Sequence, residues 1–538
     1  MKENIVFLKR VITSLTMCAL LTCALFPMYA LPAEASLIAG INSMKIEIAL
    51  SAEQKAGLLM ENMTVEQKVG QMFFCAFRQN ASGGNIVKID NNIEKIIRDC
   101  GIGGVVLFSE NIQTAKQVTD YIQSLQQASA IPLFISIDEE GGRVLRTRAL
   151  DVPRIPAALS IGNTGNAQNA YNTAKTIAGY LTPMGFNVDF APVADVFTNP
   201  SNKVIGDRAF SSDAAKAAEM VKGFVTGALD GCMLTAVKHF PGHGDTKEDT
   251  HFGMASTTKT LAELSKCEFI PFQAGIDAGT AFVMTGHITT PNIAKDKDTA
   301  GNPGIPATFS GYLLQDVLRD TLGFKGIIIT DSLEMGAITK YYTSEETAVK
   351  SVLAGVDMLL MPNNFTEAYN GMVKAVKSGK ISVKRIDESV KRILTEKYKA
   401  ALIDTPDTQA NLKHLNSYTI NNNNYVKLRD IAYILNGTAK QFEVSFDGAK
   451  NSILLISGRP YTAVGGEALS GGMGNTTATP AALKIYLDGK EINLTAYTIG
   501  GNTYFKLRDI GKAFDFNVTW NSSKNTVAIN PYEKYTDD

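Results

Sequence analysis

Three of the chain's five histidines lie close together in residues 236–253, which read AVKHFPGHGDTKEDTHFG. Imidazole changes its charge near neutral pH, and a neighbouring carboxylate can fix its tautomer and stabilise its cation, so this segment could donate and accept protons. Pro241 and Gly242 prevent a helix or a strand from continuing, which predicts a loop after the apolar run 233–237. A solvated polar loop is the plain alternative. The titratable groups are Lys238, His239, His243, Asp245, Glu248, Asp249 and His251.

Further carboxylates and cations follow other apolar runs. Asp331 directly ends the β-branched run 326–330, whose rigidity favours it over Glu334 as an attacking carboxylate. Carboxylates can serve as nucleophile, acid or base, and cations can hydrogen-bond hydroxyls, which is how a polyhydroxylated substrate would be held. The remaining charged groups after apolar runs are Asp138, Glu139, Glu140, Arg143, Arg146, Asp195, Asp207, Arg208 and His287, of which His287 is expected to pack or hydrogen-bond.

The elements that position these groups are short apolar runs alternating with amphipathic segments. Eight runs are the number that closes a parallel (β/α)8 TIM-type barrel, in which all strand ends open on one face. A doubly wound open sheet is the competing α/β architecture, because periodicity does not distinguish closure from opening. The runs are 69–74, 104–108, 132–137, 188–192, 234–238, 281–285, 326–330 and 357–361, and the helical patterns include 114–127, 166–181, 213–229, 260–278, 344–354 and 383–401.

Four segments resemble bacterial β-N-acetylglucosaminidases of glycoside hydrolase family 3, namely residues 138–146, 199–210, 238–251 and 330–335. The resemblance covers about residues 50–402 and includes the specific string KHFPGHGDTKEDTH. It implies Asp331 as nucleophile and His251, polarised by Asp249, as acid/base. It also implies that the sugar is bound by Asp138, Arg146, Arg208, Lys238 and His239. Glu139 and Thr250 depart from the glutamine and serine usual there, which puts fine specificity in doubt.

A metal site built from His239, His243, Asp245, Asp249 and His251 is the main rival interpretation. Pro241 and Gly242 lie between the first two histidines, so their spacing does not suit a helix that would present both. We therefore expect no metal and no cofactor. Four cysteines beyond the N-terminal segment lack CxxC spacing, which indicates buried thiols.

The N-terminus predicts export. Lys2, Lys9 and Arg10 precede an apolar run, and Ala33-Glu34-Ala35 offers a cleavage site, so residues 1–35 are expected to be a signal peptide. An uncleaved membrane anchor is the alternative. We assign residues 36–402 to the catalytic domain, 403–412 to a linker and 413–538 to a further module. The protein is expected to be secreted or associated with the cell wall, without a membrane span after cleavage.

Residues 413–538 contain an internal repeat. The segment 424–431, NYVKLRDI, returns as 503–510, TYFKLRDI, and each copy precedes a short helix and a strand pair. This predicts a small α+β module that resembles the stalk named after the N-terminal domain of copper amine oxidases. Its only histidine, His414, does not support copper binding. The module could contact wall polymer or act as a spacer, and Trp520 could be core or a sugar platform.

The sequence therefore predicts a secreted retaining β-N-acetylglucosaminidase that acts on wall muropeptides or chitooligosaccharides. The alternatives are a phosphorylase that uses phosphate as acceptor and an inactive wall-binding protein. The 52 basic and 53 acidic residues nearly cancel, which indicates no nucleic-acid partner.

Overall fold

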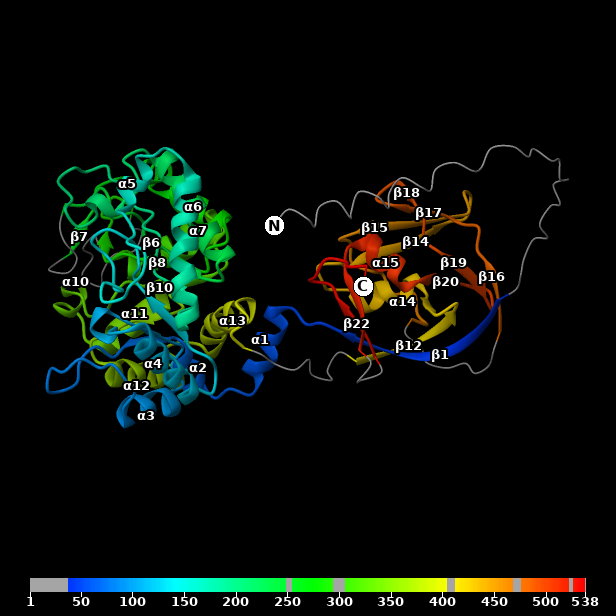
Figure 1. Ribbon diagram of the computed structural model, residues 1–538, viewed down its shortest axis with the longest axis horizontal. Helices are drawn as coiled ribbons and strands as arrows, with labels where there is room; N and C mark the ends of the chain where they lie inside the picture. The colour runs from blue at the N-terminus through cyan, green and yellow to red at the C-terminus, as the bar shows by residue number, and fades with distance from the viewer. Residues whose placement is uncertain are drawn as a thin grey trace, which may run out of the picture. The chain divides into compact units, whose positions relative to one another are not determined.

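The computed structural model describes residues 37–247, 254–293, 305–403, 412–467, 476–521 and 526–537. The chain divides into two compact units, residues 50–408 and residues 1–49 with 409–538 (Figure 1). The predicted signal peptide and most of the predicted linker lie outside the described residues. Within the described ranges, no helix has both the length and the apolar character needed to cross a bilayer.

Residues 50–408 form a closed barrel of eight parallel strands. The hydrogen-bonded order runs from β10 through β8, β6, β5, β4, β3 and β2 to β11. A parallel bridge between Ile329 and Met358 joins β10 to the start of β11, and Leu360 donates its N–H to Thr330 Oγ1 at 2.9 Å. This closure excludes the open doubly wound sheet. The strands are β2 (Phe73–Ala76), β3 (Gly104–Val106), β4 (Phe134–Ile137), β5 (Val188–Asp189), β6 (Leu234–Phe240), β8 (Phe282–Thr285), β10 (Ile327–Thr330) and β11 (Leu359–Leu360).

All eight predicted runs overlap a barrel strand, but the first was placed too early. Val65–Gln71 is helix α2, because Thr64 and Gln67 form reciprocal cap hydrogen bonds that start a helix there. Buried Val69 is therefore the inner face of a helix. The strand begins only at Phe73.

Helices surround the strands and match the predicted patterns with one exception. The pattern 260–278 is split into α8 and α9, because the ring of Pro271 would clash with the carbonyl of Cys267 if one helix continued. Helix bounds are α1 (Ala52–Glu61), α2 (Val65–Gln71), α3 (Asn91–Cys100), α4 (Ala115–Ala128), α5 (Ala158–Gly162), α6 (Ala167–Leu181), α7 (Ala214–Asp230), α8 (Leu261–Ser265), α9 (Phe269–Asp277), η6 (Tyr312–Thr321), α10 (Gly336–Thr339), α11 (Ser344–Ala354), α12 (Phe365–Lys377) and α13 (Val383–Lys399). Two short strands, β7 (Ala255–Ser256) and β9 (Ile288–Thr289), pair outside the barrel.

Aromatic rings fill the barrel interior. Phe74 stacks on Phe134 with ring centroids 6.5 Å apart, and Phe134 meets the edge of Phe282 at 5.2 Å. A Cβ at Gly104 would lie 2.6 Å from the Phe74 ring, so this glycine makes room for it. The interior is a packed core that holds the strand ends in place.

A buried lysine closes the end of the barrel opposite the predicted site. Lys397 on α13 donates to Gln71 Oε1 at 2.8 Å and lies 5.1 Å from the centre of the Phe134 ring. No acidic side chain of the described residues forms an ion pair with Lys397. Burial lowers the pKa of Lys397 to about 7. Folding therefore places an amine with little compensation inside the protein.

We expect Lys397→Met to change the pH dependence of stability. The unfolded lysine keeps its proton up to about pH 10.5, whereas the folded one loses it near pH 7, so raising the pH between these values favours the folded wild type. The free energy of unfolding of the wild type should rise by about 1.4 kcal/mol per pH unit relative to the variant. Urea unfolding at pH 7 and pH 9 measures this. Lys399→Met, at an exposed position of the same helix, should keep the pH dependence of the wild type, and equal slopes for the wild type and Lys397→Met would contradict the expectation.

The second unit is built around a ring of six strands. β1 pairs with β12 and β16, and the ring continues through β13, β20 and β19. A hairpin of β21 and β22 extends from β1, and a separate four-stranded sheet contains β14, β15, β17 and β18. The bounds are β1 (Leu37–Ile48), β12 (Leu412–Ile420), β13 (Asn423–Val426), α14 (Leu428–Leu435), β14 (Phe442–Asp447), β15 (Ser452–Ser457), β16 (Thr476–Pro480), β17 (Lys484–Leu487), β18 (Lys490–Ile492), β19 (Ala496–Ile499), β20 (Asn502–Lys506), α15 (Leu507–Phe514), β21 (Asn517–Asn521) and β22 (Thr526–Asn530).

Strand β1 corrects the predicted domain boundary. Residues 36–49 were assigned to the catalytic domain, yet β1 pairs antiparallel with β12 and parallel with β22. Met44, Ile46 and Ile48 alternate with polar residues and are buried in the core of the second unit, as a strand with one covered face requires. Figure 1 shows this blue strand among the orange and red ones. The barrel is thus inserted between β1 and β12.

The predicted repeat is confirmed in position. Each Lys-Leu-Arg-Asp-Ile string spans a strand end and the first turn of a helix, α14 in one copy and α15 in the other. β13 pairs with β20, so the copies meet directly, and Phe442 stacks on Phe514 with centroids 3.9 Å apart. A strand pair follows each helix, as expected.

Candidate active site

The carboxyl ends of the barrel strands surround a cavity of about 370 Å³. Asp138 follows β4, Lys238 and His239 belong to β6, and Asp331 follows β10. Since parallel strands end on one face, these side chains converge although they lie far apart in the sequence. The structure brings together six of the eight predicted site residues along this cavity: Asp138, Arg146, Arg208, Lys238, His239 and Asp331.

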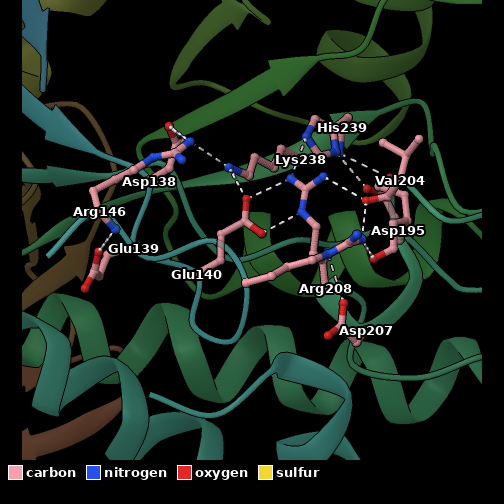
Figure 2. Close-up of polar contacts among 12 residues, drawn as sticks. Asp138, Glu139, Glu140, Arg146, Asp195, Val204, Asp207, Arg208, Lys238 and His239 are labelled. Carbon is pink, nitrogen blue, oxygen red and sulfur yellow. Dashed lines mark hydrogen bonds and ion pairs between the residues drawn. The ribbon is translucent and has the colours of Figure 1, made fainter. Parts of the chain in front are cut away.

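Glu140 is at the centre of the charge network and was not among the predicted site residues. Figure 2 shows its carboxylate between two cations, Arg208 and Lys238. Arg208 donates to both carboxylate oxygens at 2.7 and 2.8 Å, and Lys238 Nζ lies 2.7 Å from Oε1. Burial alone would raise the pKa of Glu140, but the two cations outweigh it and hold the pKa well below its usual range. Glu140 therefore fixes both cations as charged groups.

Asp138 forms the other arm of this network. It accepts from Lys238 at 2.9 Å and from Arg146 at 3.3 Å (Figure 2). Burial opposes its ionisation, yet the two cations lower the pKa of Asp138 below its ordinary value. Burial likewise opposes the charge of Lys238, and Asp138 and Glu140 raise its pKa in compensation. The network presents fixed hydrogen-bond donors and acceptors to the cavity.

Glu139 points away from the cavity and organises the loop behind it. Its carboxylate accepts from the Arg146 N–H at 2.8 Å, from the Tyr180 hydroxyl at 3.0 Å and from Thr147. The side chain is fully buried. Glu139, which stands where the glutamine is usual, therefore anchors this loop and does not face the cavity.

His239 and His243 both line the cavity. His239 Nδ1 lies 2.7 Å from Asp195 Oδ2, and Asp195 also accepts from the backbone N–H of His243 at 2.6 Å. If Nδ1 donates to Asp195, Nε2 is left as an acceptor, and it faces Arg208 at 3.5 Å. His243 Nδ1 contacts Thr246 Oγ1 at 2.6 Å, and burial lowers its pKa. His243 therefore packs the loop.

Asp331 is held rigidly at the end of β10. Its N–H donates to the Thr285 carbonyl at 2.9 Å, and Ser332 N–H donates to Oδ1 at 2.7 Å. The other carboxylate oxygen accepts no hydrogen bond from the described residues. Burial opposes ionisation, but nearby His239 and His287 and the Ser332 N–H lower the pKa of Asp331 below its ordinary 3.8. It is an ionised carboxylate with one oxygen available for attack.

His287 hydrogen-bonds to the loop that carries Asp331 and Ser332. It is fully buried, with Nδ1 2.9 Å from Thr308 Oγ1 and Nε2 2.9 Å from the Ser332 carbonyl. This matches the expectation that it hydrogen-bonds at the barrel mouth. Glu334, the weaker candidate for attack, is exposed at the rim of the cavity.

One wall of the cavity was missed by the sequence analysis. Phe108 lies between two guanidinium groups, 4.6 Å from Arg78 and 5.1 Å from Arg146, measured to its ring centre. Arg78 also pairs with Glu110. Phe108 ends a predicted run, so its place at a strand end was the signal that could have identified it.

Asp249 and His251 lie outside the described residues, and so do Glu248 and Thr250. The two flanks of this segment are tied together, because Thr257 donates to Asp245 at 3.0 Å and Lys259 lies 3.3 Å from the same carboxylate. Asp245 therefore links the two flanks.

No group of three or more metal-binding side chains is found among the described residues. The rival metal set included Asp249 and His251, which are not among them. The described members of that set are engaged otherwise, His239 with Asp195 and Asp245 with Thr257 and Lys259.

Comparison with known proteins agrees with the barrel. The family model described as the glycosyl hydrolase family 3 N terminal domain matches residues 64–396. β-Hexosaminidase A of Pseudoalteromonas piscicida is 31% identical over 396 residues, 68% of this chain and 65% of that relative, just under two thirds of its length. A β-hexosaminidase of Stenotrophomonas maltophilia K279a is 37% identical over 241 residues, 44% of this chain and 69% of that relative.

Solved structures give the same likeness. A glycoside hydrolase family 3 β-N-acetylglucosaminidase from Paenibacillus sp. FPU-7 is 35% identical with a TM-score of 0.59 and covers 65% of each chain. A β-glucoside phosphorylase is 25% identical with a TM-score of 0.58, covering 65% of this chain and 61% of that one. The family model ends at residue 396, so the likeness of the second unit to copper amine oxidase stalks stays a prediction. Because the family model spans the whole barrel and its cavity, the chain belongs to glycosyl hydrolase family 3.

Proposed function

We propose that the protein is a retaining β-N-acetylglucosaminidase that removes terminal β-linked N-acetylglucosamine from cell-wall muropeptides or chitooligosaccharides outside the cell. The observation that carries this proposal is the pairing of an ionised carboxylate, Asp331, with a wall of fixed cations and acceptors across one cavity. The relatives named β-hexosaminidase and β-N-acetylglucosaminidase support the choice of sugar. Export rests on the predicted signal peptide alone.

The geometry supports a double displacement. The sugar would be held through its hydroxyls by Asp138, Arg208 and Lys238, whose charges the network keeps in place. Asp331 would attack the anomeric carbon and form a glycosyl ester while a general acid protonates the departing oxygen. Water, deprotonated by the same group acting as a base, would then release the sugar.

The proton donor is assigned to His251, with Asp249 as its partner. His239 is the alternative among described residues, since it also pairs with an aspartate. Its Nε2, however, faces the Arg208 guanidinium, and a proton there would bring two positive charges together. His239 is better suited to accept a hydrogen bond from the substrate than to donate a proton.

Hydrolysis of aryl glycosides tests the sugar and the acceptor. We expect kcat/KM for an aryl β-N-acetylglucosaminide to exceed that for the β-glucoside by about 10²-fold or more, the discrimination of a site that hydrogen-bonds the acetamido group. Added phosphate should leave the rate and the product, free sugar, unchanged. Formation of a sugar 1-phosphate would instead identify a phosphorylase, and absence of turnover by folded protein would favour the inactive wall-binding alternative.

His251→Ala should separate the two chemical steps. An acidic phenol leaves without protonation, so sugar transfer from an activated aryl glycoside should remain nearly normal, while a natural disaccharide should react about 10²- to 10⁴-fold more slowly. A burst of phenol should precede slow turnover, and added azide, which needs no deprotonation, should relieve the slow step. Asp249→Ala should show a milder form of the same pattern.

His239→Ala is the control for this experiment. Because His239 is assigned to binding, its loss should slow aryl and natural substrates alike, without a burst and without rescue by azide. If the burst and the rescue were found in His239→Ala and not in His251→Ala, the acid/base role would pass to His239 and Asp195.

A further inference from the structure

A second cavity lies in the second unit, and none of its lining residues belongs to the proposed active site. Its volume is about 520 Å³, within the usual range for small-molecule sites. Its lining comes from segments that lie far apart in the sequence. Met44 and Lys45 on β1 contribute, and so do β12 with the turn after it, the start of α15, and β21 and β22. All these elements belong to one unit.

The chain's only tryptophan lines this cavity and is exposed. Trp520 lies on β21, the edge strand of its sheet, and 55% of its surface is accessible. An exposed indole face beside a cavity offers a flat platform for the C–H face of a sugar. The earlier alternative that Trp520 belongs to the core is wrong.

The exposed aromatic recurs in the other copy of the repeat. Residues 442–447, FEVSFD, align with 516–521, FNVTWN, so that Phe446 stands where Trp520 stands. Phe446 is 54% exposed, nearly the same as Trp520. It lies on β14 in the four-stranded sheet and is not among the residues that line the cavity. The strand position keeps an exposed aromatic in both copies, and only one copy has the cavity beside it.

The polar lining is cationic and rich in amides. Lys45, Lys506 and Arg508 line the cavity, and no aspartate or glutamate is among its lining residues. Asn422, with a left-handed φ of 59°, stands in the turn between β12 and β13, followed by two further asparagines. Amides pair with hydroxyl and acetamido groups, and a guanidinium pairs with carboxylates.

From this combination we propose that the cavity binds an acidic glycan, a chain of N-acetylated sugars that carries carboxylates, by stacking a ring on Trp520 and pairing the acid groups with Lys45, Lys506 and Arg508. A single aromatic with many amides suits a glycan better than a nucleic acid, which would stack several bases on several rings. The preference for a glycan rests on the proposed function of the barrel.

Trp520 itself reports on the test. Because the chain has no other tryptophan, the tryptophan emission comes from this unit alone, and the barrel contributes none. The full chain carrying Asp331→Ala, which leaves the glycan uncut, is titrated with a tetrasaccharide of alternating N-acetylglucosamine and N-acetylmuramic acid. We expect a saturable change in emission, about tenfold weaker affinity for the uncharged N-acetylglucosamine tetramer, and about tenfold weaker affinity in Lys506→Gln or Arg508→Gln.

Matched variants and probes decide the outcome. Phe446→Ala should leave the titration unchanged. In a sedimentation assay with insoluble cell wall, the Phe446→Ala protein should pellet with the wall, whereas the Trp520→Ala protein should stay in the supernatant. Equal affinity for the acidic and neutral tetramers would overturn the role of the cations. A response to a single-stranded oligonucleotide alone, or to no probe, would overturn the glycan site. Turnover of an aryl substrate by the Trp520→Ala chain is measured separately, so a failure of the barrel's proposed activity is distinguishable from a failure of this site.

Discussion

Asp331→Ala is expected to abolish turnover of every substrate, whatever the leaving group. The carboxylate must form a bond to the sugar in the first step, and water must break that bond in the second, so no activated aryl group can bypass its loss. Its position at the end of β10, with Oδ1 held by Ser332 N–H, leaves the other oxygen to attack. We expect a loss of about 10⁴-fold or more in kcat, as for other covalent nucleophiles.

Three measurements check this role. Glu334→Gln, in the same loop and at the rim of the cavity, should keep kcat within about tenfold, since a rim group contributes to binding rather than to bond formation. Mass spectrometry of quenched wild type should find the sugar on the peptide that contains Asp331. Because the pKa of Asp331 is below 3.8, kcat/KM should not fall with acid through this group until the pH is below that value. Equal losses in both variants, or a sugar attached elsewhere, would contradict the assignment.

Glu140→Gln is expected to destabilise the barrel by about 3–5 kcal/mol, the usual result of removing one partner from a buried charge network. Arg208 and Lys238 would remain buried, with Asp138 as the only carboxylate of the described residues left within 3 Å of Lys238. Activity should fall as well, because the same two cations face the cavity. Urea unfolding and steady-state kinetics measure the two effects.

The pH dependence of this stability has a definite sign. The folded pKa of Glu140 lies below its ordinary 4.5, so the carboxylate stabilises the folded state above that value and loses its contribution as the pH falls below it. The difference between wild type and Glu140→Gln should therefore be constant from pH 6 to 8 and shrink below about pH 4.5. Glu110→Gln breaks the more exposed pair with Arg78 and should cost at most about 1 kcal/mol. Similar losses in both variants would show that Glu140 is no more than a surface partner.

Much of the barrel and its mouth could be predicted from the sequence because the signals are local. An apolar run followed by a charged residue marks a strand end, and this found Asp138, Lys238 and Asp331. The choice between Glu139 and Glu140 needed one more step. Side chains two apart share a face in extended chain, so Glu140 should follow Asp138 into the mouth and Glu139 should turn away, as they do.

Other features of the fold could not be predicted from local sequence, because they depend on strands that are distant in the sequence. The alternation of residues 44–48 identifies a strand, but nothing local tells whether it joins the barrel or a sheet completed after residue 412. The split at Pro271 was readable from the clash of its ring, whereas the ring of six strands around β1 was not.

The insertion of the barrel between β1 and β12 also fixes the order in which the chain can fold during synthesis. β1 is made first, while its partners β12, β16 and β22 follow only after the entire barrel has been made. Until then both edges of β1 are unpaired, and unpaired strand edges can pair with other chains. The second unit can accordingly be completed only after the barrel has been synthesised, and β1 stays exposed to pairing with other chains until then.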